Sequence, residues 1–385
     1  MQKDFHYYAT YCAAYIAGYS HEESVEIAYS ANFVDHCTRT LLSRIGGPDQ
    51  AATTQLSLEM MDARTDIVGL QDITRIWASF HFLPKDLYAP VKGTKRYRNK
   101  YRLICGPNGD LVEETVKLAM GQSLQAAGLA MHVLADTWAH RNFAGTPSLV
   151  INNVTSYFFE LIDTPEGTVE RRVTFRHSGK DDLEGSKYIN TIYQNGETSV
   201  MSLGHGRAGH LPDYSFARYK YLPAWGNYGE IIKDNPSDYY HAFCQMVYAL
   251  KTLRNGGTFV KDTYDWEAVE PWKEEIQSLL VIRQLDACQQ WKALGEKLSG
   301  CSIDEFEITA HEAEYKEAAE EDKSRTFLGR FILAAMAQKS MVTNKIYKSG
   351  NIMAGISIDY NEKGFKGIKD FVKLVEYAGK EAEDE

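Results

Sequence analysis

The sequence predicts a mainly α-helical protein, a single multi-helix domain built around one buried central helix, with a small β-hairpin insertion. Three observations support this fold class. Residues 118–131 carry no formal charge and are rich in Ala, Leu, Met and Gln, which are strong helix formers. Helical periodicity returns in several segments between residues 236 and 346. Between residues 150 and 213, alternating and turn-forming runs instead indicate a β insertion at about 163–203.

Length and composition are those of an ordinary soluble protein with a sizeable core. The chain has 385 residues, of which 44% are hydrophobic and 24% are charged. The formal net charge of −10 argues against a general polyanion binder, because nucleic-acid affinity depends on phosphate neutralisation by Lys and Arg. The basic stretch 92–102 is either a local basic site or a solvated loop.

Two helices are expected at the start of the chain. Aromatic and apolar residues at 5–17 predict a first helix that ends at Gly18. Ser20 is followed three residues later by Glu23, which is the pattern of a capping box. This pattern predicts a second helix that runs to about Cys37.

The following residues alternate between regular structure and loops. Within 53–69, the alternation in QLSLEMM indicates a short strand, and 70–80 is expected to be helical. The prolines and glycines of 83–110 predict an excursion of loops. The buried central helix is then expected to run from about Asp110 to Arg141.

The second half of the chain is expected to return to helices after the β insertion. The predicted helices lie at 238–253, 272–294, 303–323 and 325–346. Residues 364–385 are expected to form an amphipathic helix and an acidic tail, of which EAEDE is disordered. No linker is long enough to separate two domains, so residues 1–363 are predicted to form one helical domain.

The most informative segment lies inside the expected central helix. His132, Asp136 and His140 are spaced four apart, so they share one face of a helix. A buried carboxylate between two imidazoles is costly unless it is paired, hydrogen-bonded or bound to metal. At about 1.5 Å per residue the two histidines lie roughly 12 Å apart, which favours two or more ions over one shared ion. A buried His-Asp-His hydrogen-bond ladder is the alternative.

Other His and Asp residues stand where they can converge on this face. Asp4 opens the first helix, where it is equally suited to capping and to metal binding. His6 follows in an aromatic stretch, in which a lone His is more often a packed core residue. Asp35 ends an apolar run at the inner end of the second helix, and His81 is bracketed by aromatic residues.

A glycine-rich motif, GHGRAGHLPD at 204–213, adds His205 and His210. Its glycines allow the backbone to approach a ligand or ion closely, although a surface turn explains the motif as well. Together with the central helix, these residues offer nitrogen and oxygen ligands and no Cys ligand. Such a set suits zinc, or alternatively manganese or iron, at a multinuclear site.

Motifs for competing chemistries are missing from the sequence. It contains no phosphate-binding loop, no dinucleotide fingerprint, no nucleophile elbow and no HExxH motif. The six cysteines are scattered without a CxxC pair, which indicates reduced, buried thiols. Without a signal peptide or an apolar run of membrane-spanning length, a cytoplasmic protein with no membrane span is expected.

On these residues the chain resembles the superfamily of zinc-dependent phospholipases C and single-strand-specific nucleases. Those proteins are mainly helical and hold a trinuclear zinc cluster that hydrolyses phosphodiester bonds. His81 in FHF matches an element of that superfamily, and His132 and Asp136 match its central helix. The opening DFHYYATYCAAYIAGYSHEES and the GHGRAGHLPD motif are more closely similar to an uncharacterised bacterial family. The resemblance covers about residues 1–220.

The resemblance implies a phosphodiesterase-type hydrolase with two to three zinc ions. The ligands that it implies are Asp4, His6, Asp35, His81, His132, Asp136, His140, His205 and Asp213. Asp4 is expected to replace the processed N-terminal Trp, through which the secreted enzymes bind metal. Asp35 and Asp136 are the expected catalytic carboxylates, the first orienting water and the second bridging metals.

The expected substrate is a small phosphoester or a phospholipid-like molecule. Arg207 and His210 are expected on its binding side, with a solvated Arg as the alternative. A different class of function is a non-catalytic binding or scaffold protein that keeps the fold and one structural metal. A helical oxidase with a dinuclear iron site requires Glu-x-x-His pairs, and the central helix has none.

Overall fold

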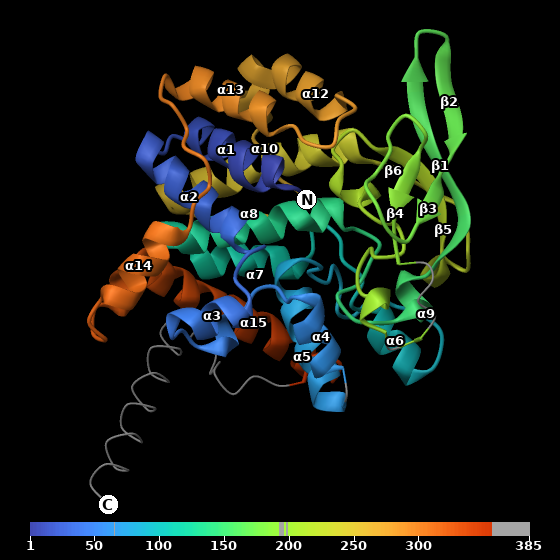
Figure 1. Ribbon diagram of the computed structural model, residues 1–385, viewed down its shortest axis with the longest axis horizontal. Coiled ribbons are helices and arrows are strands. Elements are labelled where there is room, and N and C mark those ends of the chain that lie inside the picture. The colour runs from blue at the N-terminus through green and yellow to red at the C-terminus, as the bar shows by residue number, and fades with distance from the viewer. Residues whose placement is uncertain (65, 192–195, 198, 356–385) are drawn as a thin grey trace, which may run out of the picture.

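Helix α8, Leu124–Ala139, lies at the centre of the fold (Figure 1). Its residues from Gln125 onward are buried. The computed structural model describes residues 1–64, 66–191, 196–197 and 199–355. The helices packed against α8 are α2 (His21–Phe33), α5 (Ile67–Phe80), α7 (Asp110–Ala119), α10 (Asn235–Asn255) and α15 (Phe327–Lys348). Because these helices cover α8, its polar side chains must find their partners inside the protein. The protein is mainly α-helical, as predicted.

The two helices expected at the start of the chain are present. A π-helical turn, Asp4–Ala9, continues directly into α1, Thr10–Ile16. At the start of α2 the predicted capping box is formed: the Ser20 hydroxyl accepts from the backbone N–H of Glu23, and the Glu23 carboxylate accepts from that of Ser20. The N-terminal turn packs against α2, which brings residues 1–6 close to α8.

Two predictions for the following segment are wrong. The alternating sequence QLSLEMM contributes to helix α4, Ser57–Ala63, and not to a strand. Its apolar residues Leu56 and Leu58 are exposed, so the alternation does not mark a half-buried sheet face. The expected loop excursion contains helix α6, Lys95–Tyr101, which begins where the Thr94 hydroxyl accepts from a backbone N–H.

The expected central helix is divided into two helices, α7 and α8. Between them Met120 has an extended backbone, and Gly121 adopts a left-handed conformation with φ of 67°. Ser123 then caps the new helix by accepting a hydrogen bond from the N–H of Ala126. The interruption lets α7 and α8 pack against each other, which one continuous helix cannot do.

The β region is larger than the predicted insertion, and its main sheet is antiparallel. Its main sheet has the strand order β2-β1-β5-β6. These strands are β1 (Val154–Thr164), β2 (Gly167–Arg172), β5 (Arg218–Pro223) and β6 (Ile231–Asp234). Two short strands, β3 (Thr174–Arg176) and β4 (Lys187–Ile189), pair in parallel. The connection between β4 and β5 contains the GHGRAGHLPD motif, which returns the chain to α8.

Short helices complete the described part of the chain. They are α3 (Arg39–Ile45), α9 (Leu149–Asn152), α11 (Trp266–Val269), α12 (Lys273–Val281), α13 (Cys288–Ser299) and α14 (Thr309–Glu317). The segment 272–294, expected as one helix, is divided between α12 and α13. Among the described helices, none is long and apolar enough to cross a membrane. The predicted helix and tail at 364–385 lie outside the described residues.

Candidate metal centre

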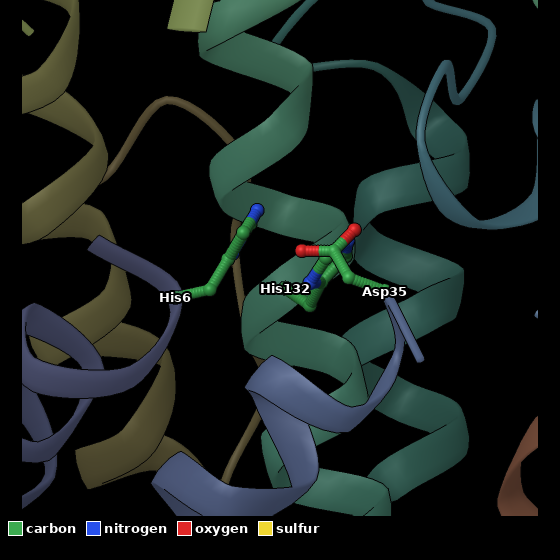
Figure 2. Close-up of side chains that lie close together, drawn as sticks. All are labelled: His6, Asp35 and His132. Atoms are coloured by element: carbon green, nitrogen blue, oxygen red, sulfur yellow. The ribbon is translucent and has the colours of Figure 1, made fainter. Parts of the chain in front are cut away.

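Five parts of the chain bring His and Asp side chains together beside α8. The N-terminal turn contributes His6, the residues after α2 contribute Asp35, the end of α5 contributes His81, α8 and its C-cap contribute His132, Asp136 and His140, and the glycine-rich loop contributes His205 and Asp213. Figure 2 shows His6, Asp35 and His132 approaching one another from three separate elements. The convergence joins residues more than 200 positions apart in sequence.

Both carboxylate oxygens of Asp136 contact other groups of this centre. Oδ1 lies 2.8 Å from the amino group of Met1 and 3.2 Å from Nε2 of His6. Oδ2 lies 3.2 Å from Nδ1 of His81 and 3.2 Å from Nε2 of His132. The side chain is only 1% exposed. Asp136 thus joins the N-terminal turn, α5 and α8 through one buried carboxylate.

Backbone carbonyls hold four of the histidines in place. The hydrogen bonds run from His132 Nδ1 to Ala31 O (2.8 Å), His140 Nδ1 to His81 O (2.7 Å), His205 Nδ1 to Gly209 O (2.8 Å) and His81 Nε2 to Thr53 O (3.1 Å). A carbonyl oxygen only accepts, so the ring nitrogen facing it carries the proton. Each ring therefore turns its other nitrogen into the centre, which is the arrangement that metal-binding histidines adopt.

The inward nitrogens of His81 and His132 form a triangle with Asp136. Nδ1 of His81 and Nε2 of His132 are 3.3 Å apart, and each lies 3.2 Å from Oδ2 of Asp136. In neutral imidazoles these two nitrogens carry lone pairs, because their protons are used by the carbonyl bonds. Three lone pairs directed at one another repel unless a cation or an added proton lies among them.

His6 is the least satisfied polar side chain of the centre. It is fully buried, and its ring stacks on that of His132 at a centroid distance of 3.7 Å. Neither of its ring nitrogens makes a well-aligned hydrogen bond, although Nε2 lies 3.2 Å from Oδ1 of Asp136. Burial, with a smaller contribution from the neighbouring His132, lowers the pKa of His6 to about 3, so the ring is neutral. A buried, unbonded imidazole is costly, and coordination of a cation would remove that cost.

The third group of ligand-type atoms lies at the C-terminal end of α8. Nε2 of His140 is 2.9 Å from Oδ1 of Asp213, and Nε2 of His205 is 3.3 Å from Oδ2 of the same carboxylate. Gly209 has a φ of 60°, and a Cβ there would lie 2.2 Å from the carbonyl oxygen of Ile189. Only glycine therefore permits the loop to close over His205 in this way.

The pKa values of all three carboxylates of the centre are lowered, although Asp136 and Asp213 are buried. Burial opposes ionisation of Asp136, but His140 and the amino group of Met1 outweigh it and hold the pKa of Asp136 well below its usual range. His205 and the same amino group lower the pKa of Asp213 in the same way. For Asp35, the neighbouring imidazoles likewise outweigh burial and lower the pKa.

One cationic group is present among these carboxylates. Burial opposes the charge on the Met1 amino group, but Asp136, Asp213 and Asp35 raise its pKa to about 11. The ammonium group lies 3.3 Å from both Nε2 of His140 and Oδ1 of Asp213. One ammonium balances one of three carboxylates, and burial lowers the pKa of His140. The centre therefore favours additional positive charge.

Asp4 does not join the other expected ligands. Its carboxylate accepts from the backbone N–H groups of Phe5 and Ala287, at 2.8 and 3.3 Å, and burial raises its pKa to about 6. The position that sequence reasoning assigned to Asp4 is taken by the amino group of Met1, which reaches Asp136. No residue pattern indicated that Met1 and not Asp4 would contact Asp136, because this contact depends on how the π-helical turn packs.

The two residues expected at the substrate have different settings. Arg207 is 5% exposed, and its guanidinium donates to Oδ1 of Asn153 and to the backbone oxygen of Thr191. Its hydrogen bonds therefore tie the loop to the β region. His210 keeps about half of its side chain exposed and lies 3.4 Å from a carboxylate oxygen of Asp181. That carboxylate raises the pKa of His210 through the hydrogen bond.

A family comparison covers nearly all of the described chain. The chain belongs to the family of unknown function DUF6765. The family model matches residues 1–346, a range that contains every residue of the centre and ends within α15. Comparison with curated proteins and with solved structures finds no match.

Proposed function

We propose that this protein is a metal-dependent phosphoric ester hydrolase that holds two to three zinc ions in this centre. The observation that carries the proposal is the triangle formed by His81, His132 and Asp136, whose inward nitrogens and carboxylate oxygen lie 3.2–3.3 Å apart. The unbonded nitrogens of His6 and the surplus of negative charge support it. A hydrogen-bond ladder does not account for them, since it would satisfy these nitrogens.

The donor set fits zinc, with manganese or iron as alternatives. It consists of imidazole nitrogens and carboxylate oxygens, which all three metals accept. The three groups are His6, Asp35 and His132; His81, His132 and Asp136; and His140, His205 and Asp213. Within each group the ligand-type atoms lie no more than 4.8 Å apart, and His132 belongs to two of them. Adjacent ions are therefore supported.

Two or more such ions supply a nucleophilic water at neutral pH and neutralise the charge of a phosphoryl group. Among the carboxylates, Asp35 is the most accessible, with 36% of its side chain exposed. It can therefore accept a hydrogen bond from the attacking water and orient it. Asp136 is buried and lies within 3.5 Å of four imidazoles, so it would hold and position the ions.

Metal content and hydrolysis of bis-p-nitrophenyl phosphate test the proposal together. Purified protein should contain more than one equivalent of transition metal by plasma emission, and a chelator should abolish hydrolysis until zinc is restored. Asp136→Asn should lose both metal and activity. Asp4→Asn is the matched control, because that carboxylate lies apart from the three groups, and it should keep both.

Less than about one equivalent of metal, unchanged by added zinc, would overturn the proposal. Bound metal without hydrolysis of any phosphoester would instead favour a binding or scaffold protein with a structural ion.

A further inference from the structure

A largely apolar cavity of about 440 Å³ lies beside the metal centre. It lies between helix α4, the end of α5 and the residues that precede and form the glycine-rich loop. The apolar side chains that define it include Met60, Trp77, Phe82, Val200, Met201 and Leu203. His205, one of the ligand-type residues of the centre, forms part of the same wall.

The cavity and the centre share aromatic walls. The ring of Phe82 stacks on His140 at 4.7 Å between centroids and lies 5.8 Å from His205. The ring of Trp77 lies 4.9 Å from that of His81. A group bound in the cavity is thus separated from the ligand-type imidazoles by no more than one side chain.

Two polar side chains of the wall, those of Asn190 and Thr191, are engaged with the protein backbone. The amide of Asn190 donates to the carbonyl of Arg207 at 2.7 Å, and the hydroxyl of Thr191 donates to that of Met201 at 2.7 Å. Among the described residues that line the cavity, none is Lys, Arg, Asp or Glu. The ionisable side chains of the wall are therefore the imidazoles of His177, His205 and His210, and the rest of the wall offers mainly apolar contact.

We propose that this cavity binds one compact apolar group, aryl or short alkyl, that is attached to the phosphorus-bearing end of the substrate. This inference rests on the proposed function, because the metal centre is what holds the phosphoryl end. Ligand cavities commonly have volumes of about 300–1,000 Å³, so this one suits a single small group. The substrate class is therefore a phosphoester with one small hydrophobic substituent.

Binding of phosphonates, which do not hydrolyse, separates the cavity from the metal centre. Calorimetry with methyl-, butyl- and phenylphosphonate should show affinity rising about fourfold for each methylene that enters the cavity. Zinc-loaded protein should then bind butylphosphonate on the order of 50-fold more tightly than methylphosphonate. Phenylphosphonate should exceed methylphosphonate by at least about tenfold.

Filling the cavity should abolish this preference. In Met60→Trp and Met201→Trp the three phosphonates should bind within about threefold of one another, with methylphosphonate unchanged from wild type. Met61→Trp is the matched control, because Met61 follows Met60 in α4 but is 45% exposed and does not line the cavity. It should keep the full preference.

Two results would overturn different claims. Equal affinity for the three phosphonates in zinc-loaded wild type, or an undiminished preference in both cavity variants, would overturn the cavity assignment and leave the metal centre intact. The proposed function would be overturned if methylphosphonate bound independently of zinc and the preference for butyl- over methylphosphonate were the same with and without zinc. That result would support the cavity assignment.

Discussion

Replacing His6 by Leu should stabilise the metal-free protein and destabilise the metal-loaded one relative to wild type. In the metal-free chain the neutral ring of His6 is fully buried, and neither nitrogen makes a well-aligned hydrogen bond, although Nε2 lies 3.2 Å from the Asp136 carboxylate. A buried polar atom without a partner costs about 1–3 kcal/mol. Leu removes that cost with a side chain of similar volume, so the free energy of unfolding should rise by up to about that amount.

The size of the thermal shift follows from the chain length. The entropy of unfolding is about 2.1 cal/mol/K per residue, and the chain has 385 residues. Dividing the gain of about 1–3 kcal/mol by this entropy gives a Tm rise of about 1–4 °C for the metal-free variant. Zinc at about 1,000 times its Kd stabilises wild type by about 4.1 kcal/mol, which exceeds the gain expected for the metal-free variant, and a variant that no longer binds this ion gains none of it. The order of the two Tm values should therefore reverse when zinc is added.

Differential scanning calorimetry with chelator and with zinc measures the Tm values of wild type and variant in both states. His21→Leu, which changes an imidazole outside the centre, controls for loss of a His as such. A lower Tm for metal-free His6→Leu, combined with undiminished stabilisation by zinc, would show that His6 is an ordinary core residue and would refute the reasoning.

Three further predictions concern packing, pH and metal number. Gly128→Ala should lower the free energy of unfolding in urea by about 1–3 kcal/mol, since its Cβ would lie 2.2 Å from Ile27 O, whereas Gly226→Ala should not. Burial lowers the pKa of Lys233 from 10.5 to about 8. Between these two pH values the folded state has released a proton that the unfolded state still holds, so the free energy of unfolding should rise with pH in wild type relative to Lys233→Met. Asp213→Asn should lose about one equivalent of zinc by plasma emission and keep the remainder; full retention would contradict the third group.

Local signals predicted several parts of this structure correctly. The four-residue spacing placed His132, Asp136 and His140 at one side of a helix, because helical geometry depends only on neighbouring residues. The capping box at Ser20 and Glu23 likewise acts over a single turn. Such short-range physics is readable from the order of residues alone.

Signals that depend on tertiary context led to wrong predictions for two elements. Ala, Leu and Met continue around Gly121, so propensity predicted one helix where the packing of α7 on α8 requires two. The alternation near Leu56 predicted a strand, but strands need a partner, and the local sequence forms α4. Arg207 lies beside His205 in sequence, yet its guanidinium is held by the β region.

By itself the sequence determined a mainly helical chain, the ligand spacing along its buried helix and a donor set free of Cys. Only the tertiary structure decided that Met1 reaches Asp136 while Asp4 does not. It also decided which imidazole nitrogen faces the centre, because the carbonyl that orients His132 is 101 residues away at Ala31. Periodicity encodes contacts within an element, whereas these choices arise where separate elements pack.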